Sequence, residues 1–244
     1  MTKAKVIQAA NFRVHRLHPA LIAGPDLTVR GDRIELIPVF FAQSQLDSAC
    51  SHHMLASIFS ILSLARPSAL ISQSHRRYGV SAAIFKQLRE FWHTGITPEE
   101  FVERVNNLDL SLELTARFKA SPDLDQFAIR NLMRGELVAL SIASVHTRTT
   151  NHFTLGVGAS AVQRGSKTET DTLLLLDASG SPPVFREYNA ILRLAPPATR
   201  SKRSSYPELD ASSRRKALNW SYSAPEWGAE IVRITSAIRF RLSG

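Results

Sequence analysis

The sequence predicts an α+β fold, in which a helical N-terminal half packs on an antiparallel β-sheet formed by the C-terminal half. Before Gly135, apolar residues recur at helical spacing, whereas after Gly135 short apolar runs alternate with turns. Because α/β proteins interleave helices and strands along the chain, this segregation favours α+β. A length of 244 residues, 44% of them hydrophobic and 21% charged, fits one globular domain and excludes wholesale disorder.

Helices are expected where apolar residues recur every three or four positions. Four stretches meet this criterion: residues 50–65, 81–93, 97–106 and 121–135. Pro67 ends the first stretch. Thr97 and Ser121 are the expected N-caps of the third and fourth, and Gly135 is the expected stop of the fourth.

Strands are expected where short apolar runs are bounded by turn residues. Two short ones, at 27–30 and 33–41, flank a Gly-Asp turn. The remaining runs follow Gly135 and occupy residues 137–144, 152–160, 172–179, 186–194 and 230–242. Residues 1–25 carry no pattern and predict no element.

These elements suggest a division of the chain into four segments. Residues 1–35 form an N-terminal arm with short strands, and residues 36–195 form the domain that carries the candidate site. Residues 196–219 are a basic Ser/Pro-rich loop or linker, and residues 220–244 contribute C-terminal strands to the same domain.

The charge is strongly basic, with a formal net charge of +9 and a sequence pI of about 10.2. Much of it lies in residues 193–216, which hold seven basic and two acidic residues. One interpretation is that residues 200–216 bind an anionic partner such as nucleic acid. The other, which we favour, is a solvated basic loop, because no aromatic stacking pattern or zinc finger accompanies the charge.

The cysteine count and the hydropathy of the sequence exclude several classes of protein. A single cysteine, Cys50, excludes an intrachain disulfide and a cysteine-based zinc site. No apolar run approaches the roughly 18 residues of a membrane helix, and no secretory signal is recognisable at the start. We therefore expect a cytoplasmic protein that neither crosses a membrane nor needs a metal or cofactor.

Three residues occupy positions suited to nucleophilic catalysis. Cys50 begins a predicted helix, where the unpaired N–H groups and the positive end of the helix dipole stabilise a thiolate. His152 begins a predicted strand and Asp177 ends the next one, so a hairpin would bring them together as base and orienting acid. Taken singly, each has a structural alternative: a small core residue, a strand-end histidine and a turn aspartate. His146 is a competing but less well placed histidine.

Two glutamines precede the cysteine and are candidate oxyanion donors. Gln43 and Gln45 lie a few residues before Cys50, where an amide N–H can act together with the cysteine's backbone N–H. Either may equally be a loop residue on the surface, and the sequence does not separate the two.

The order of these residues resembles that of the papain-like cysteine peptidases, and within them the bacterial C39-like group. The carrying segments are FFAQSQLDSACSHHMLASIFSIL, LDQFAIRNLMRGELVALSI, NHFTLGVG and LLLLDASG, within residues 36–195. The resemblance implies a papain-like fold, with Cys50 as nucleophile at a helix N-terminus, His152 as base and Asp177 as orienting acid. It also implies that Gln43 or Gln45 holds the oxyanion.

The expected function is a soluble cysteine (thiol) peptidase, a hydrolase that cleaves a peptide or amide bond of a protein substrate through a thioester. Ser51 departs from the family pattern, which has glycine after the cysteine, and His52 and His53 are also unusual there. They either tune the thiol or are ordinary first-turn residues. Alternatives are acyl transfer at the same site, or a non-enzymatic module that binds a protein or nucleic acid.

Overall fold

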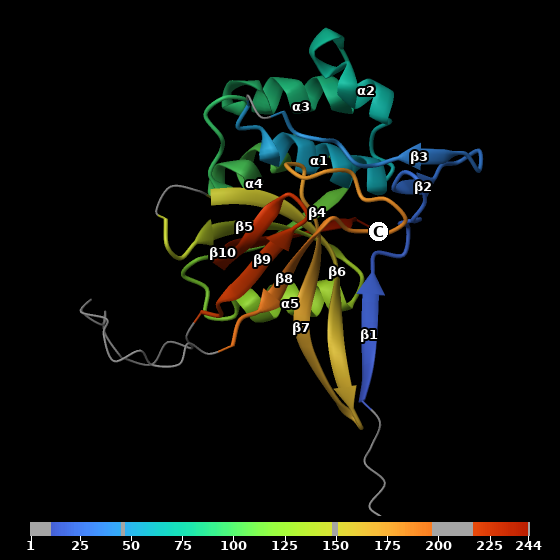
Figure 1. The fold of residues 1–244 in the computed structure, drawn as a ribbon. Helices are drawn as coiled ribbons and strands as arrows, with labels where there is room; N and C mark the ends of the chain where they lie inside the picture. Colours follow the sequence, from blue (N-terminus) through green and yellow to red (C-terminus); the bar gives the residue numbers. More distant parts are fainter. Residues whose placement is uncertain (1–10, 45–46, 148–150, 197–216, 244) are drawn as a thin grey trace, which may run out of the picture.

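A closed six-stranded antiparallel β-barrel forms the centre of the protein (Figure 1). The computed structural model describes residues 11–44, 47–147, 151–196 and 217–243. The barrel strands are β5 (Leu137–Ser144), β6 (Asn151–Arg164), β7 (Lys167–Leu176), β8 (Ala190–Leu194), β9 (Trp220–Ala224) and β10 (Trp227–Leu242). The order β6-β5-β10-β9-β8-β7 closes on itself because β6 pairs with both β5 and β7.

Further strands extend the barrel at two places. The strand β1 (Asn11–Leu17) pairs with β6, and β4 (Leu112–Phe118) pairs with β10. A separate hairpin joins β2 (Thr28–Arg30) to β3 (Leu36–Pro38).

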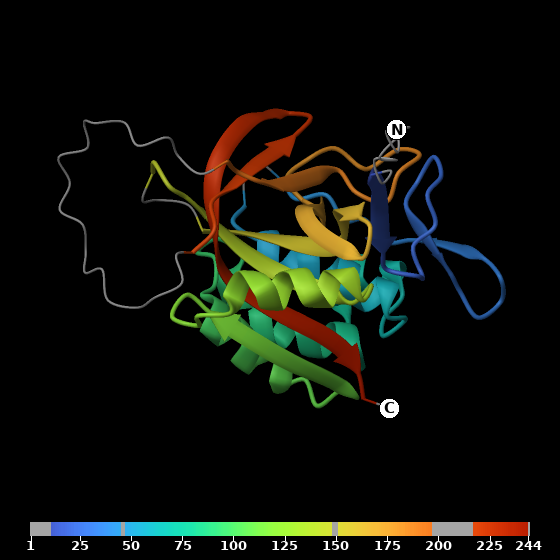
Figure 2. The ribbon, with the colours of Figure 1, turned by 90° about the horizontal axis from the view of Figure 1, so that it is seen from below.

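The helices are short and connect or cover the strands. They are α1 (Cys50–Ile61), α2 (Pro67–Ile71), the 3-10 turn η1 (Gln73–His75), α3 (Val80–Leu88), the 3-10 turn η2 (Arg89–Phe91), α4 (Pro98–Asn106) and α5 (Leu124–Met133). The helices α1 to α4 lie on one side of the barrel and α5 lies on the other (Figures 1 and 2).

The predicted fold class, an α+β papain-like fold with a helical half packed on a sheet, is wrong. The described part of the chain is mostly β, and its sheet closes into a barrel. Three strands account for the difference: the sequence predicted neither β1 nor β4, and for β9 it predicted only that residues 220–244 contribute strands. Two of them, β1 and β4, place the N-terminal half of the chain in the sheet, and β9 links β8 to β10 to complete the ring.

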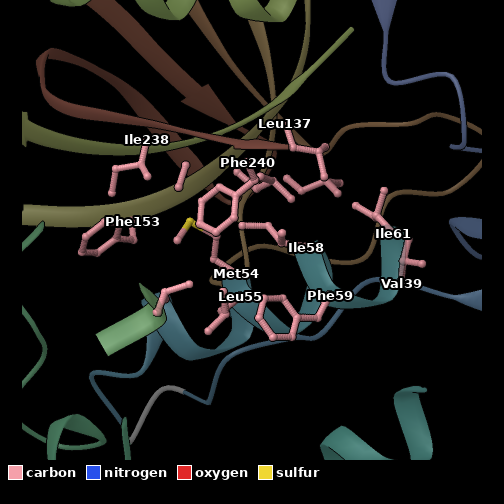
Figure 3. Packing of buried hydrophobic residues seen from close by; sticks show 14 of the residues in the cluster. Val39, Met54, Leu55, Ile58, Phe59, Ile61, Leu137, Phe153, Ile238 and Phe240 are labelled. Atoms are coloured by element: carbon pink, nitrogen blue, oxygen red, sulfur yellow. The ribbon is translucent and has the colours of Figure 1, made fainter. Parts of the chain in front are cut away.

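Two buried clusters lie on opposite faces of the barrel wall. Interior residues from all six strands pack with one side of α5, as Leu140, Leu173 and Trp220 do with Phe127. The outer face of β5, β6 and β10 packs against α1, whose Met54 and Ile58 belong to the same cluster as outward residues of these strands (Figure 3). Burial on both faces explains why β5 reads as a continuous apolar run.

Local predictions for the helices are largely confirmed. The helix α1 begins at Cys50, and Thr97 caps α4 as expected, where it forms a capping box with Glu100. Gly135 follows α5 with φ +77°, a conformation that favours glycine. The expected cap at Ser121 is wrong: α5 begins after Asp123, and the Ser121 hydroxyl accepts from the backbone N–H of Phe118.

The C-terminal strands are integral to the barrel. The strand β9 pairs with β8, and β10 pairs with β4, β5 and β9. Most of the basic segment, including the residues 200–216 considered for an anionic partner, lies outside the described residues. Within the described residues, no helix is long and apolar enough to cross a membrane.

Candidate active site

Cys50 is the first residue of α1 and is partly exposed to solvent. The first turn of α1 holds no acidic residue, and no side chain caps the helix at Ala49. The first backbone N–H groups of a helix have no partner within the helix and carry partial positive charge. A thiolate at Cys50 is therefore placed where the helix end stabilises it.

His152 is the second residue of β6 and lies between an acid and the thiol. Its Nε2 is 2.8 Å from both carboxylate oxygens of Asp177. The imidazole also interacts with the side chain of Cys50, and this interaction favours its protonated form. Because Nε2 faces the carboxylate, Nδ1 is the ring nitrogen that remains for the sulfur.

The sheet register explains why His152 and Asp177 meet. His152 is paired with Ile142 of β5, and directly opposed residues project to the same face of a sheet. Ile142 points into the barrel, so His152 does too. Asp177 comes two residues after the interior residue Leu175 and therefore has the same orientation. Both side chains thus project inward at one rim of the barrel.

Asp177 is buried, with 1% of its surface exposed, and its carboxylate accepts three kinds of donor. Besides His152, the backbone N–H of Ser179 donates to Oδ1 at 2.8 Å and the Tyr222 hydroxyl donates to Oδ2 at 2.5 Å. The side chain of Asn189 clamps the backbone of Asp177, accepting from its N–H at 2.7 Å and donating to its carbonyl at 2.8 Å. The acid is thus fixed at both its backbone and its side chain.

The protonation states follow from these contacts. Burial lowers the pKa of His152, but the hydrogen bonds and charges of Asp177 and Cys50 outweigh it and hold that pKa above the ordinary 6.5. Burial raises the pKa of Asp177, and the hydrogen bonds from His152, Tyr222 and Ser179 more than offset this, so the net shift is downward. An imidazolium facing a carboxylate is the favoured state at neutral pH.

Gln43 is tied to both the cysteine segment and the acid loop. Its Nε2 donates to the carbonyl oxygen of Asp47 at 3.0 Å, and its Oε1 accepts from the Ser179 hydroxyl at 3.2 Å. Its backbone N–H donates to the Ala178 carbonyl oxygen at 2.7 Å. Within the described residues, the second Nε2 hydrogen has no partner, as an oxyanion donor needs. Gln45, the other candidate, lies outside the described residues.

No protein-family model matches this chain, and no curated protein matches it. A functional assignment therefore depends on the chemistry of the site itself.

The two histidines after the cysteine lie on the buried side of α1. His52 is hydrogen-bonded through Nε2 to the Leu88 carbonyl oxygen at 2.7 Å, and burial lowers the pKa of both imidazoles. Both rings contact the indole of Trp92, with centroids 5.1 and 5.7 Å away. Nε2 of His53 is 3.9 Å from a carboxylate oxygen of Asp47 and makes no hydrogen bond within the described residues. The hydrogen bond of His52 to Leu88 and its ring contact with Trp92 give this histidine a structural role in packing α1.

Two other residues of the sequence analysis can now be placed. Ser51, which replaces the expected glycine, is buried with 1% of its surface exposed. The competing histidine, His146, is exposed in the turn after β5, and within the described residues it makes no hydrogen bond or ion pair with Cys50 or Asp177. Within the described residues, no cluster of three or more His, Cys, Asp or Glu side chains is arranged to hold a metal ion.

Sequence reasoning missed Tyr222, Asn189 and Ser179, which all bind Asp177. Tyr222 lies on β9, for which the sequence predicted only that residues 220–244 contribute strands, and Asn189 directly precedes β8. No local motif marks either residue. The alternation of Trp220, Tyr222 and Ala224 into the barrel is the one signal that points Tyr222 toward the interior.

Proposed function

We propose that this protein is a cysteine peptidase that cleaves a peptide or amide bond of a protein substrate through a thioester. The observation that carries the proposal is the position of His152, which is held by Asp177 at 2.8 Å while its imidazole interacts with the side chain of Cys50 at the start of α1. Nucleophile, base and orienting acid in this arrangement support acyl transfer.

In the acylation step, the Cys50 thiolate attacks the carbonyl carbon of the scissile bond, and an electron pair moves to the carbonyl oxygen. When this tetrahedral intermediate collapses, the C–N bond breaks and the His152 imidazolium gives its proton to the departing amine. Asp177 keeps the ring oriented and stabilises its charged form.

In the deacylation step, a water molecule attacks the thioester while neutral His152 takes one of its protons. Collapse of the second intermediate releases the carboxylic acid and regenerates the thiolate and the imidazolium. The oxyanion of each intermediate would be held by the Cys50 backbone N–H and by the free Nε2 hydrogen of Gln43.

The resemblance to C39-like peptidases is part of this proposal only for the residues around the site. It supports the roles of Cys50, His152 and Asp177 and does not extend to the fold. A single cysteine that works as a thiolate suits a reducing compartment, and we place the protein in the cytoplasm as part of the same proposal.

The first test is the alkylation rate of Cys50 by iodoacetamide between pH 5 and 9, followed by intact mass. A thiol with the ordinary cysteine pKa is about 1% thiolate at pH 6.5, so a fully formed thiolate reacts up to about 100-fold faster. Its reduced nucleophilicity removes part of that gain. We expect His152→Ala to slow labelling at pH 6.5 by at least about 10-fold.

His146→Ala is the matched control because His146 is exposed in the turn after β5 and is not the histidine bonded to Asp177. It should leave the labelling profile unchanged. Slow labelling of the wild-type protein that rises only near pH 8.5, with no effect of His152→Ala, would contradict the peptidase proposal. That result would favour a non-enzymatic binding module.

A second experiment separates hydrolysis from acyl transfer. A peptide library from a digested proteome is incubated with wild-type and Cys50→Ala protein in ¹⁸O-labelled water. New C-termini carrying ¹⁸O, absent with Cys50→Ala, identify hydrolysis. New peptide bonds joining library members, without ¹⁸O, identify transpeptidation and would replace hydrolysis as the activity of the site.

A further inference from the structure

We infer that Tyr222 is a positioning residue that acts through Asp177: its hydroxyl holds the carboxylate in its charged form and takes up part of the negative charge that faces His152. The inference rests on the proposed function, because it assigns Tyr222 a role within the same arrangement of Cys50, His152 and Asp177. It is carried by the burial and geometry of one hydrogen bond.

The bond itself is short and charge-assisted. The Tyr222 hydroxyl lies 2.5 Å from Oδ2 of Asp177, within the range for an O–H donor on a carboxylate. Both residues are buried, with 8% and 1% of their surfaces exposed. Burial and the neighbouring carboxylate raise the pKa of Tyr222, so the proton stays on the phenol and the phenol is the donor.

Packing alone does not require this hydroxyl. The Tyr222 ring belongs to the barrel interior, between Trp220 and Ala224 on the same face of β9. A phenylalanine would supply the same apolar ring. What the hydroxyl adds is a hydrogen-bond donor at the rim of the barrel, where it reaches the Asp177 carboxylate.

A second contact joins the same hairpin to the acid loop. Glu226, in the turn between β9 and β10, accepts from the backbone N–H of Ser181 at 2.9 Å. Asn189 donates to the carbonyl of that serine at 2.9 Å while it clamps Asp177. The β9–β10 hairpin therefore binds the acid loop at two residues, Asp177 through Tyr222 and Ser181 through Glu226. This hairpin lies outside the part of the chain that carries the sequence resemblance.

The charged groups around this bond are few. Tyr222 faces Asp177 and, more weakly, Glu226. His152 faces Asp177 and Cys50. Removing the Tyr222 hydroxyl takes one donor from the carboxylate, so the remaining negative charge binds the imidazolium more tightly. The direction of the effect is thus an increase in the pKa of His152.

The test is an NMR titration of His152 in full-length ¹⁵N-labelled protein. Cys50→Ala provides the background, because it removes the thiol's own influence on the imidazole, and a His152→Ala spectrum assigns the signal. We expect Tyr222→Phe to raise the pKa of His152 by about half to one pH unit. Tyr78→Phe is the control, because Tyr78 is 88% exposed, and it should leave the titration unchanged. A folded Tyr222→Phe protein with an unchanged or lowered His152 pKa would overturn the inference.

A second measurement avoids any loss of folding. Replacing all tyrosines by 3-fluorotyrosine keeps the packing and makes each hydroxyl a stronger donor, and Tyr222 is the described tyrosine bonded to Asp177. The pKa of His152 should then fall, and an unchanged value overturns the inference.

Neither titration needs a substrate or a thiol. A shifted His152 pKa together with an unreactive Cys50 supports the positioning role of Tyr222 and contradicts the peptidase proposal. A reactive Cys50 with an unshifted His152 pKa supports the peptidase proposal and contradicts the positioning role.

Discussion

The backbone N–H of Gln43 donates to the carbonyl oxygen of Ala178 at 2.7 Å. This bond joins the segment that leads to Cys50 to the residue directly after Asp177. The Ser179 hydroxyl adds a second link, to the Gln43 side chain at 3.2 Å. The nucleophile segment and the acid loop are therefore one connected unit, although they are far apart in the sequence.

Gln43→Ala is expected to lower kcat by about 100-fold, the usual loss of one oxyanion donor. The labelling rate of Cys50 should change little, because alkylation forms no oxyanion. The measurement compares turnover of a substrate from the peptide library with iodoacetamide labelling of the same protein. Ser179→Ala is the control, since it removes the contact to Oε1 and leaves the amide donor in place. Equal losses in both variants would show that Gln43 is a structural link only.

Stability at acid pH should depend on His18. Burial lowers the pKa of His18 from 6.5 to about 4, so below pH 6.5 the unfolded chain binds a proton that the folded chain does not. The free energy of unfolding is therefore fully retained above pH 6.5 and falls between pH 6.5 and 4. His18 accounts for at most about 3 kcal/mol of that fall.

Urea unfolding at pH 7 and pH 4.5 measures this loss. We expect the wild-type protein to lose more stability between the two conditions than His18→Gln does. His15→Gln is the matched control, because His15 is exposed on the strand that precedes His18. The hypothesis is wrong if both variants lose as much stability as the wild-type protein.

The positions of the three candidate residues were more predictable from the sequence than the fold was. Cys50, His152 and Asp177 lie at element boundaries that apolar patterning marks well: the start of α1, the start of β6 and the end of β7. Adjacent strands in the sequence also pair in the barrel here, so the β6–β7 hairpin was sufficient to bring the histidine and the acid together.

The barrel was not predictable because the strands that complete it carry weak patterns. Most residues of β1 are exposed, including Phe12 and Arg13, so no apolar alternation reveals the strand. Pairing with β6, together with the ion pair of Arg13 and Asp171, holds it in place instead. The strand β9 has five residues and follows the basic segment. It forms a hairpin with β10, but the ring closes only through its pairing with β8, which precedes the basic segment.

Asp177→Asn tests the electrostatic role of the acid at nearly constant volume. The imidazolium of His152 loses its charge partner, so the pKa of His152 should fall toward or below 6.5. We expect the labelling rate of Cys50 at pH 6.5 to fall by about 3- to 10-fold, with a smaller effect at pH 9, where a cysteine of ordinary pKa is largely ionised. Asp171→Asn, which alters a carboxylate paired with Arg13 away from the site, is the control. An unchanged profile in Asp177→Asn would mean that the acid does not act on the thiol through His152.

Asp47→Asn tests a charge that opposes the thiolate. The Asp47 carboxylate accepts from the Ala49 N–H at 3.0 Å, directly before α1, and only 7% of the side chain is exposed. A negative charge there counteracts the positive end of the helix dipole at Cys50. Asparagine keeps an oxygen acceptor for Ala49 and removes the charge, so labelling of Cys50 at pH 5 should become about 2- to 4-fold faster.

The measurement is the same labelling assay, with Asp32→Asn as the control because Asp32 is exposed in the β2–β3 turn. A slower rate in Asp47→Asn would mean that the Asp47 charge orients the cysteine segment. The charge could do so through His53, whose Nε2 lies 3.9 Å from the Asp47 carboxylate. His53→Gln then separates the two effects. If Asp47 orients the cysteine segment through His53, His53→Gln slows the labelling of Cys50 as much as Asp47→Asn does. If the Asp47 charge acts directly on the thiolate, His53→Gln leaves the labelling rate unchanged.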